Sequence, residues 1–124
     1  MPRVDIPLVM KAETASTRTI VSSDFGSVIT NRGGGALTVT LPAPAQGNKG
    51  CYVDFFTVAA GDFVITTSAG EEIVALNNAT ADSLTLGQAN EEIGNGMRVI
   101  SDGTSWLPFV SWAAEAVTSV VGDA

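Results

Sequence analysis

Apolar side chains in this chain recur mainly at every second position, in short runs separated by turn-forming residues. The clearest run is Leu-Thr-Val-Thr-Leu at residues 37–41, where three aliphatic side chains share one face and two threonines share the other. Such alternation is typical of a strand that has one face against a core. Similar runs, rich in β-branched residues, recur about every ten residues between 17 and 110. The pattern predicts an all-β fold, either a single antiparallel β-sandwich or a small barrel.

Turn signals between these runs support that prediction. Residues 31–35, Asn-Arg-Gly-Gly-Gly, supply the positive φ angles that a tight hairpin needs. Two prolines end the run at 37–41, because proline cannot donate to a strand ladder. Asp102-Gly103 is the strongest short hairpin signal in the chain, and it predicts an antiparallel pairing of the runs on either side.

Residues 1–16 are predicted to form an extended arm. Val4, Ile6 and Leu8 alternate with polar residues and proline, and the prolines exclude a central strand. Three apolar side chains on one side of an arm cannot bury themselves against the arm. We therefore expect them to contact the domain itself, a neighbouring subunit or a larger partner, with a frayed terminus as the alternative.

The C-terminal segment, residues 112–124, carries two conflicting signals. Apolar residues from Phe109 onward recur at three- and four-residue spacing, which suits an amphipathic helix that Gly122 would end. The β-branched run at 117–121 favours an extended tail instead. The sequence leaves both alternatives, a short helix and a tail, open.

Four aromatic side chains are candidates for core or trimer packing. Phe55 and Phe56 are adjacent in the most apolar run, so they point to opposite faces of a strand that we expect to be covered on both. Trp106 and Trp112 follow the predicted Asp-Gly hairpin. Stacking of Tyr52, Trp106 and Trp112 on sugars is an alternative, but packing is the commoner role of a tryptophan beside a hairpin.

The chain has 124 residues and a formal net charge of −7, and its length suits one domain. We place that domain at 17–111, between the arm at 1–16 and the segment at 112–124. The acidic balance argues against binding to nucleic acid or to an anionic membrane surface, since both are bound through cations. The start lacks the apolar core of a signal peptide, and no apolar run reaches the roughly 18 residues of a membrane span. We therefore expect a soluble protein that folds in a reducing compartment.

The sequence offers no catalytic set, and we expect neither an enzyme nor a bound cofactor or metal. It contains no histidine and one cysteine, which removes the commonest general base and any cysteine cluster for a metal. The carboxylates of Glu71-Glu72 and of Glu91-Glu92 are adjacent in sequence, so each pair points to opposite faces of an extended chain. Neither pair forms the converging dyad of a glycosidase. The glycines of 31–35 lack the Lys-Ser/Thr of a phosphate-binding loop.

Three stretches of the chain are distinctive: SSDFGSVI at 22–29, LTVTLPAPAQG at 37–47 and VISDGTSW at 99–106. Together they resemble small β-rich structural proteins of tailed bacteriophages. That group includes head decoration (cement) proteins and modules of tail fibres and spikes. The resemblance covers roughly residues 17–110.

The resemblance implies a function without catalysis. Decoration proteins of this group commonly form trimers that sit where capsid subunits meet, and an extended arm commonly reaches another subunit. The chain is thus expected to bind the major capsid protein on the outer head surface of a virion, after synthesis in the host cytoplasm. Val4, Ile6 and Leu8 are then the expected shell contacts. The alternative is a tail-fibre or receptor-binding β module that recognises a host surface glycan through Trp106, Tyr52 and nearby carboxylates.

Overall fold

The computed structural model describes residues 9–75, 78–86, 93–112 and 117–121. Most of its regular structure is β-strand, and two short 3-10 helices, η1 and η2, lie at corners of the chain. The prediction of a β-rich fold is therefore confirmed. The elements in chain order are β1 (Val9–Ala12), β2 (Thr17–Thr19), η1 (Ser22–Asp24), β3 (Ser27–Thr30), β4 (Leu37–Leu41), η2 (Gln46–Asn48), β5 (Tyr52–Phe56), β6 (Phe63–Thr67), β7 (Ile73–Ala75), β8 (Asn78–Ala81), β9 (Ser83–Leu86), β10 (Gly96–Ser101), β11 (Trp106–Trp112) and β12 (Val117–Val121).

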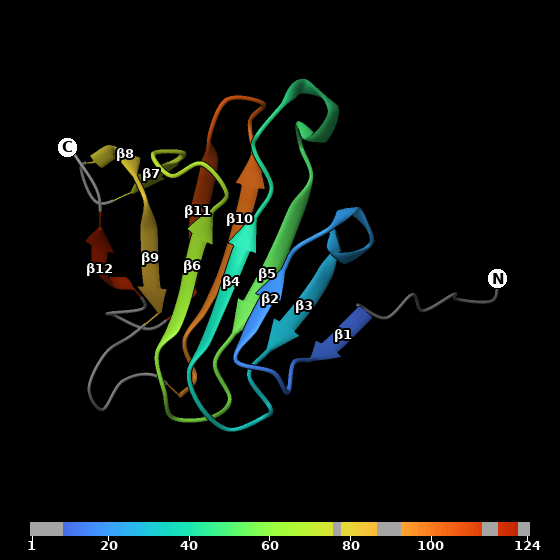
Figure 1. Cartoon of the computed structure of the whole chain (residues 1–124), viewed down its shortest axis with the longest axis vertical. Coiled ribbons are helices and arrows are strands. Elements are labelled where there is room, and N and C mark those ends of the chain that lie inside the picture. The colour runs from blue at the N-terminus through green and yellow to red at the C-terminus, as the bar shows by residue number, and fades with distance from the viewer. Residues whose placement is uncertain (1–8, 76–77, 87–92, 113–116, 122–124) are drawn as a thin grey trace, which may run out of the picture.

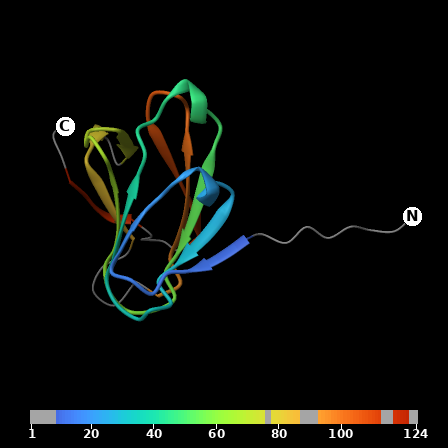
Figure 2. The same cartoon turned by 45° about the vertical axis from the view of Figure 1, so that its right-hand side comes forward.

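The strands form two mixed sheets, which Figures 1 and 2 show as two layers. Sheet A is 7-stranded, in the order β1-β3-β5-β10-β11-β7-β8, and sheet B is 5-stranded, in the order β12-β9-β6-β4-β2. The first two strands of the chain are thus the edge strands on the same side of the molecule, β1 in sheet A and β2 in sheet B. An edge strand pairs on one side only and presents free backbone groups on the other.

The first six strands wind alternately between the two sheets. β1, β3 and β5 lie side by side in sheet A, β2, β4 and β6 lie side by side in sheet B, and all of these pairings are parallel. Each successive pair, β1–β2, β3–β4 and β5–β6, is one coil of this winding. Val28 pairs with Asp54 in sheet A and Leu37 pairs with Phe63 in sheet B, so the third coil follows the second at the same sequence separation in both sheets.

The prediction of antiparallel sheets is wrong for this part of the chain. The loop at 31–35, expected to close a hairpin, instead carries the chain from β3 in sheet A to β4 in sheet B. Antiparallel pairing begins later, where β9 pairs with β6 and β10 with β5. The hairpin predicted at Asp102-Gly103 is confirmed, since it joins β10 to β11 in antiparallel register.

The core lies between the two sheets and is filled by side chains from both. Phe55 of β5 and Phe63 of β6 meet edge to face, with ring centroids 5.6 Å apart. Trp106 of β11 is fully buried, and its indole Nε1–H donates to the Pro42 carbonyl oxygen at 2.8 Å. The Phe25 ring packs beside it, with a centroid distance of 6.3 Å. Each layer thus contributes aromatic rings that span the space between the sheets.

The loops that cross from sheet A to sheet B stack on one another at one end of the coils. Their backbones approach so closely that two positions have no room for a side chain. A Cβ atom on Gly33 would lie 2.7 Å from Thr14 Cα, and one on Gly61 would lie 2.6 Å from the carbonyl carbon of Gly35. Real Cβ atoms do not approach backbone this closely, so the stacking requires glycine at both positions.

A buried asparagine holds two of the stacked loops together. Asn31 accepts hydrogen bonds at Oδ1 from the backbone N–H groups of Val58 at 2.8 Å and Ala59 at 3.2 Å. Its Nδ2 donates to the Ala59 carbonyl oxygen at 3.0 Å. A side-chain amide that both donates and accepts satisfies backbone groups of the neighbouring coil that the strand ladders do not reach.

The structure places part of each end of the chain in a sheet. Residues 9–12, predicted as part of an arm, pair in register with β3 and so belong to sheet A. Residues 117–121 form β12, which pairs antiparallel with β9, so the extended alternative holds there and the helix alternative is wrong. Residues 1–8 lie outside the described residues.

Candidate functional site

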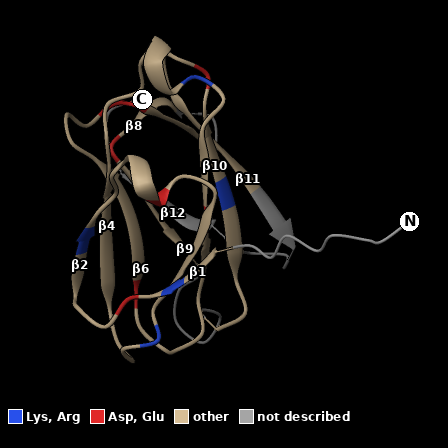
Figure 3. Cartoon of the chain, turned by 90° about the vertical axis from the view of Figure 1, so that its right-hand side faces the viewer, with Lys and Arg blue, Asp and Glu red and all other residues tan. Residues whose placement is uncertain are grey.

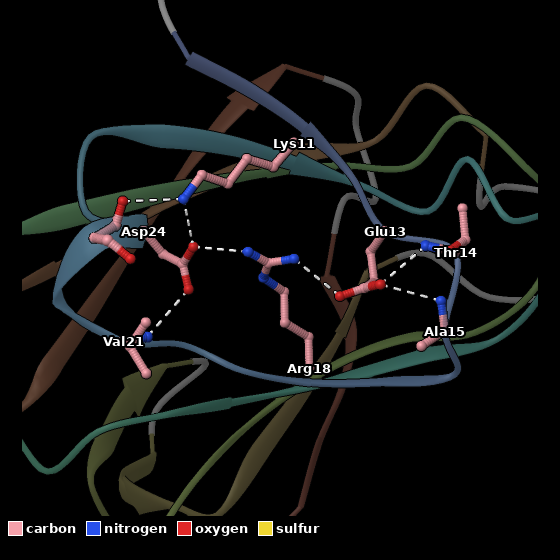
Figure 4. A network of polar contacts seen from close by, with 8 residues as sticks. Lys11, Glu13, Thr14, Ala15, Arg18, Val21 and Asp24 are labelled. Carbon is pink, nitrogen blue, oxygen red and sulfur yellow. Dashed lines mark hydrogen bonds and ion pairs between the residues drawn. The ribbon is translucent and has the colours of Figure 1, made fainter.

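The first coil carries charged side chains where the other coils carry apolar ones. Lys11 of β1 pairs with Ile29 in sheet A, and Arg18 of β2 pairs with Val39 in sheet B. Residues paired across neighbouring strands share one face of the sheet. Ile29 and Val39 belong to the core, so Lys11 and Arg18 point toward the space between the sheets at its free end, as Figure 4 shows.

Two carboxylates neutralise these cations. Asp24 is 1% exposed, and its Oδ1 accepts hydrogen bonds from Lys11 Nζ and Arg18 Nη2, each at 2.7 Å. Its Oδ2 accepts the backbone N–H of Val21 at 3.1 Å, which fixes the start of η1. Arg18 Nη1 donates to Glu13 Oε1 at 2.9 Å. This first-coil ion network ties β1, β2 and η1 together across the gap between the two sheets.

The network keeps its acids ionised. Burial raises the pKa of Asp24, but hydrogen bonds from Arg18 and Lys11 outweigh it and hold that pKa at about 2. The pKa of Glu13 is lowered mainly by a hydrogen bond from the backbone N–H of Ala15. The carboxylates are therefore committed to ion pairs and backbone donors. We interpret the network as a polar closure of the core at the free edges of the two sheets.

The network predicts a loss of stability in acid. The pKa of Asp24 is about 2 in the folded chain against an ordinary value of 3.8, so the unfolded chain takes up the proton first as pH falls. The stabilisation is complete above about pH 4 and is lost between about pH 4 and pH 2, amounting to about 2 kcal/mol. Urea unfolding at a series of pH values should show Asp24→Asn less stable than wild type by about 2–3 kcal/mol at pH 6.

The low-pH end of the same urea series, and a second variant, are the controls for this prediction. The stability difference between wild type and Asp24→Asn should shrink as pH approaches 2, because the wild-type carboxyl is then protonated as well. Asp62→Asn, at an exposed aspartate, should change the unfolding free energy by less than about 0.5 kcal/mol at any pH. A difference for Asp24→Asn that stays constant down to pH 2 would contradict the assignment.

A surface pocket of about 340 Å³ lies beside the network, between the first two stacked loops. Its wall includes Glu13 and Asn31, whose polar side-chain atoms already bond to other groups of the chain. The glycines of 33–35 and the residues Thr14 and Ser16 complete much of the lining. Ala15, Ala36 and Leu37 also line the pocket, so it presents apolar groups together with backbone and hydroxyl groups. Among the described residues, no three His, Cys, Asp or Glu side chains gather in a way that could hold a metal ion.

The outer face of sheet A carries a row of larger side chains. Register partners across β1, β3, β5, β10 and β11 place five residues in line, and we call them the outer row: Met10, Val28, Asp54, Arg98 and Phe109. Met10 is 63% exposed and Phe109 is 55% exposed, one at each end of the row. The row therefore presents apolar groups to solvent on both sides of a central pair of charges.

The two charges of the outer row form a tightly defined pair. Arg98 Nε donates to Asp54 Oδ1 at 2.7 Å, and Arg98 Nη2 donates to Asp54 Oδ2 at 3.0 Å. The guanidinium carbon of Arg98 also lies 4.1 Å from the centroid of the Tyr52 ring. A bidentate ion pair that is stacked on an aromatic ring holds its side chains in one geometry.

The structure separates the residues that the sequence grouped as packing candidates. Phe55 and Trp106 are buried in the core, whereas Phe56 is half-buried on β5. Trp112 is the last residue of β11, and its side chain lies outside the described residues. The predicted shell contacts Val4, Ile6 and Leu8 also lie outside them.

Sequence reasoning missed the first-coil ion network and the outer row. Only Arg18 had a local signal, because it stands inside a β-branched run. The signal for Asp24 was absent, since its partners lie on other elements.

No helix within the described ranges has both the length and the apolar character to cross a membrane. Comparisons with family models, with curated proteins and with solved structures find no match to this chain.

Proposed function

We propose that this chain is a non-enzymatic structural protein of a tailed-phage virion, one that decorates the outer surface of the head and bridges major capsid subunits. The proposal combines the resemblance of three sequence stretches to phage decoration proteins with one structural observation. β1 is the edge strand of sheet A, in register with β3, and the first-coil ion network anchors it to β2 and η1. In this proposal residues 1–8 are the arm, and the strand that follows them is fixed at the free edge of the domain.

In this proposal the two sheets form a β-sandwich, a rigid body that positions the arm. Val4, Ile6 and Leu8 contact the shell and bury about 100–300 Å² of apolar surface, which contributes a few kcal/mol at about 25 cal/mol per Å². Assembly as a homotrimer links three such contacts, so that the second and third form at high effective concentration. Tight attachment to the head then needs no single strong contact.

The aromatic contacts suggested for a glycan-binding module are poorly placed in this structure. Trp106 is fully buried, with its indole N–H already donated to Pro42. One face of the Tyr52 ring is covered by the Arg98 guanidinium. These observations favour the capsid proposal over recognition of a host glycan through those two residues.

Removal of residues 1–8 should strongly weaken head binding without unfolding the protein. The truncation leaves β1 and the ion network intact, so circular dichroism should match that of the full chain. Co-sedimentation with purified undecorated heads should show an affinity at least about 100-fold lower for the truncated protein, because three linked contacts are lost. Val21→Ser, at a valine that is 52% exposed outside the arm, is the matched control and should bind like wild type.

Each result of this experiment has a definite meaning. Full decoration by the truncated protein would contradict the proposal that the arm binds the head. If the full chain does not bind heads and the virion holds only a few copies relative to the major capsid protein, the protein would be assigned to the tail and not to the head.

A further inference from the structure

We propose that the outer face of sheet A, centred on the outer row, is the surface through which copies of this chain associate with one another. Contact between the same face on two copies closes a two-fold pair, so this inference is independent of the homotrimer in the proposed function, which would use other contacts. The residues that carry the inference are Met10, Asp54, Arg98 and Phe109.

The composition of this face is that of an interface centre. Aromatic residues, methionine and arginine are enriched at the buried centres of protein interfaces, whereas lysine, glutamate and aspartate are depleted. Asp54 is the exception on this face, and its charge is neutralised by Arg98. Beside the outer row, Tyr52, Ile100 and Leu107 lie half-buried on β5, β10 and β11. Ile100 pairs with both Tyr52 and Leu107, so the three form a second row parallel to the first.

The charge of the face favours a second copy of this chain as the partner. Asp54 and Arg98 are the charged residues of the outer row, and they neutralise each other within the face. A face whose charges cancel internally does not repel the same face on another copy. The chain as a whole carries a net charge of −7, so copies that approach through more acidic surfaces repel each other. Figure 3 shows that much of the strand ribbon carries neither Lys, Arg, Asp nor Glu.

The ion pair also lowers the cost of association. Arg98 is held by two hydrogen bonds to Asp54 and by the Tyr52 ring before any partner arrives. Side chains that are already fixed lose little rotamer freedom when an interface forms. The centre of the face is thus pre-organised, and the exposed ends, Met10 and Phe109, supply apolar area.

The size of the face sets the expected strength. With neighbouring strands about 4.8 Å apart, a row across β1, β3, β5, β10 and β11 spans about 19 Å. That width falls short of what an interface of about 800 Å² per partner requires. We therefore expect reversible association that depends on protein concentration, with dissociation constants on the order of 10–100 μM.

Analytical ultracentrifugation of the purified full chain, over a range of concentrations and without heads, tests the proposal. Phe109→Glu places a carboxylate at the exposed end of the row and should weaken association at least about tenfold. Val21→Glu adds the same charge at another exposed apolar residue and should leave the association constant unchanged. Met10→Glu, at the opposite end of the row, gives a second independent test if Phe109→Glu fails to fold.

The results separate this inference from the proposed function. Wild-type protein that stays monomeric up to about 1 mM, or equal weakening by Val21→Glu and Phe109→Glu, would overturn the inference. Self-association that depends on the outer row, combined with failure of the full chain to bind heads, would support this surface and contradict the capsid proposal.

Discussion

Replacing Trp106 with alanine is expected to lower the free energy of unfolding by about 4 kcal/mol. The side chain is fully buried between the sheets beside Phe25, so its truncation leaves a cavity. The hydrogen-bonded strands on either side prevent the core from collapsing to fill it. The substitution also removes the donor to the Pro42 carbonyl oxygen. Because Pro42 directly follows β4 in sheet B and Trp106 lies in sheet A, this hydrogen bond joins the two layers.

Urea denaturation followed by circular dichroism measures this loss. Trp106→Phe keeps much of the apolar volume but not the indole donor, and it should cost about 1–2 kcal/mol. Phe109→Ala, in the same strand but at a residue that is 55% exposed, should cost less than about 1 kcal/mol. A loss below about 1 kcal/mol for Trp106→Ala would show that the tryptophan does not fill the core as described.

Gly61→Ala should be nearly as damaging, through a different mechanism, and should cost about 3–4 kcal/mol. Gly61 has φ +136°, a conformation that side chains with a Cβ rarely adopt. The added methyl group would also lie 2.6 Å from the carbonyl carbon of Gly35 and 2.7 Å from the backbone nitrogen of Ala36. Neither atom belongs to a flexible side chain, so the stacked loops must separate.

Two other glycines separate the contributions to this effect. Gly34 has φ +78° but open space around its Cβ position, so Gly34→Ala should cost about 1 kcal/mol from backbone strain alone. Gly47 has neither a positive φ nor a neighbour within 4 Å, and Gly47→Ala should change the unfolding free energy by less than about 0.5 kcal/mol. Equal costs at Gly34 and Gly61, measured by urea denaturation, would mean that the loops do not stack closely.

The positions of the strands were predictable from the sequence, but their partners were not. Alternation at 37–41 identifies which side chains enter the core, because the period of two follows from the geometry of one strand. The same pattern fits any neighbour in either sheet. Gly33 to Gly35 allow a hairpin and a crossing loop equally well, so the parallel winding depends on contacts that no local signal encodes. The Asp102-Gly103 hairpin was predictable because that signal lies within two adjacent residues.

The first-coil ion network and the outer row could not be predicted for the same reason, since both depend on which strands are neighbours. Lys11 and Asp24 contact each other at 2.7 Å although they lie on different elements, and neither residue is unusual in its local sequence. Arg98 and Asp54 are even further apart along the chain. Ion pairs of this kind become visible only when strand order and register are known, whereas a buried Phe55 follows from its position in an apolar run.

The parallel winding of the first six strands also has a consequence for the order of events during synthesis. Each coil pairs with the coil made just before it, so residues 9–67 can begin to pair as the chain leaves the ribosome. In the finished fold the outer edges of β5 and β6 are covered by β10 and β9, which are translated later. Besides the lasting edges of β1 and β2, the nascent protein therefore carries an uncovered edge of β6 until residues 83–86 are made and an uncovered edge of β5 until residues 96–101 are made. This interval is when it is most exposed to aggregation with other chains.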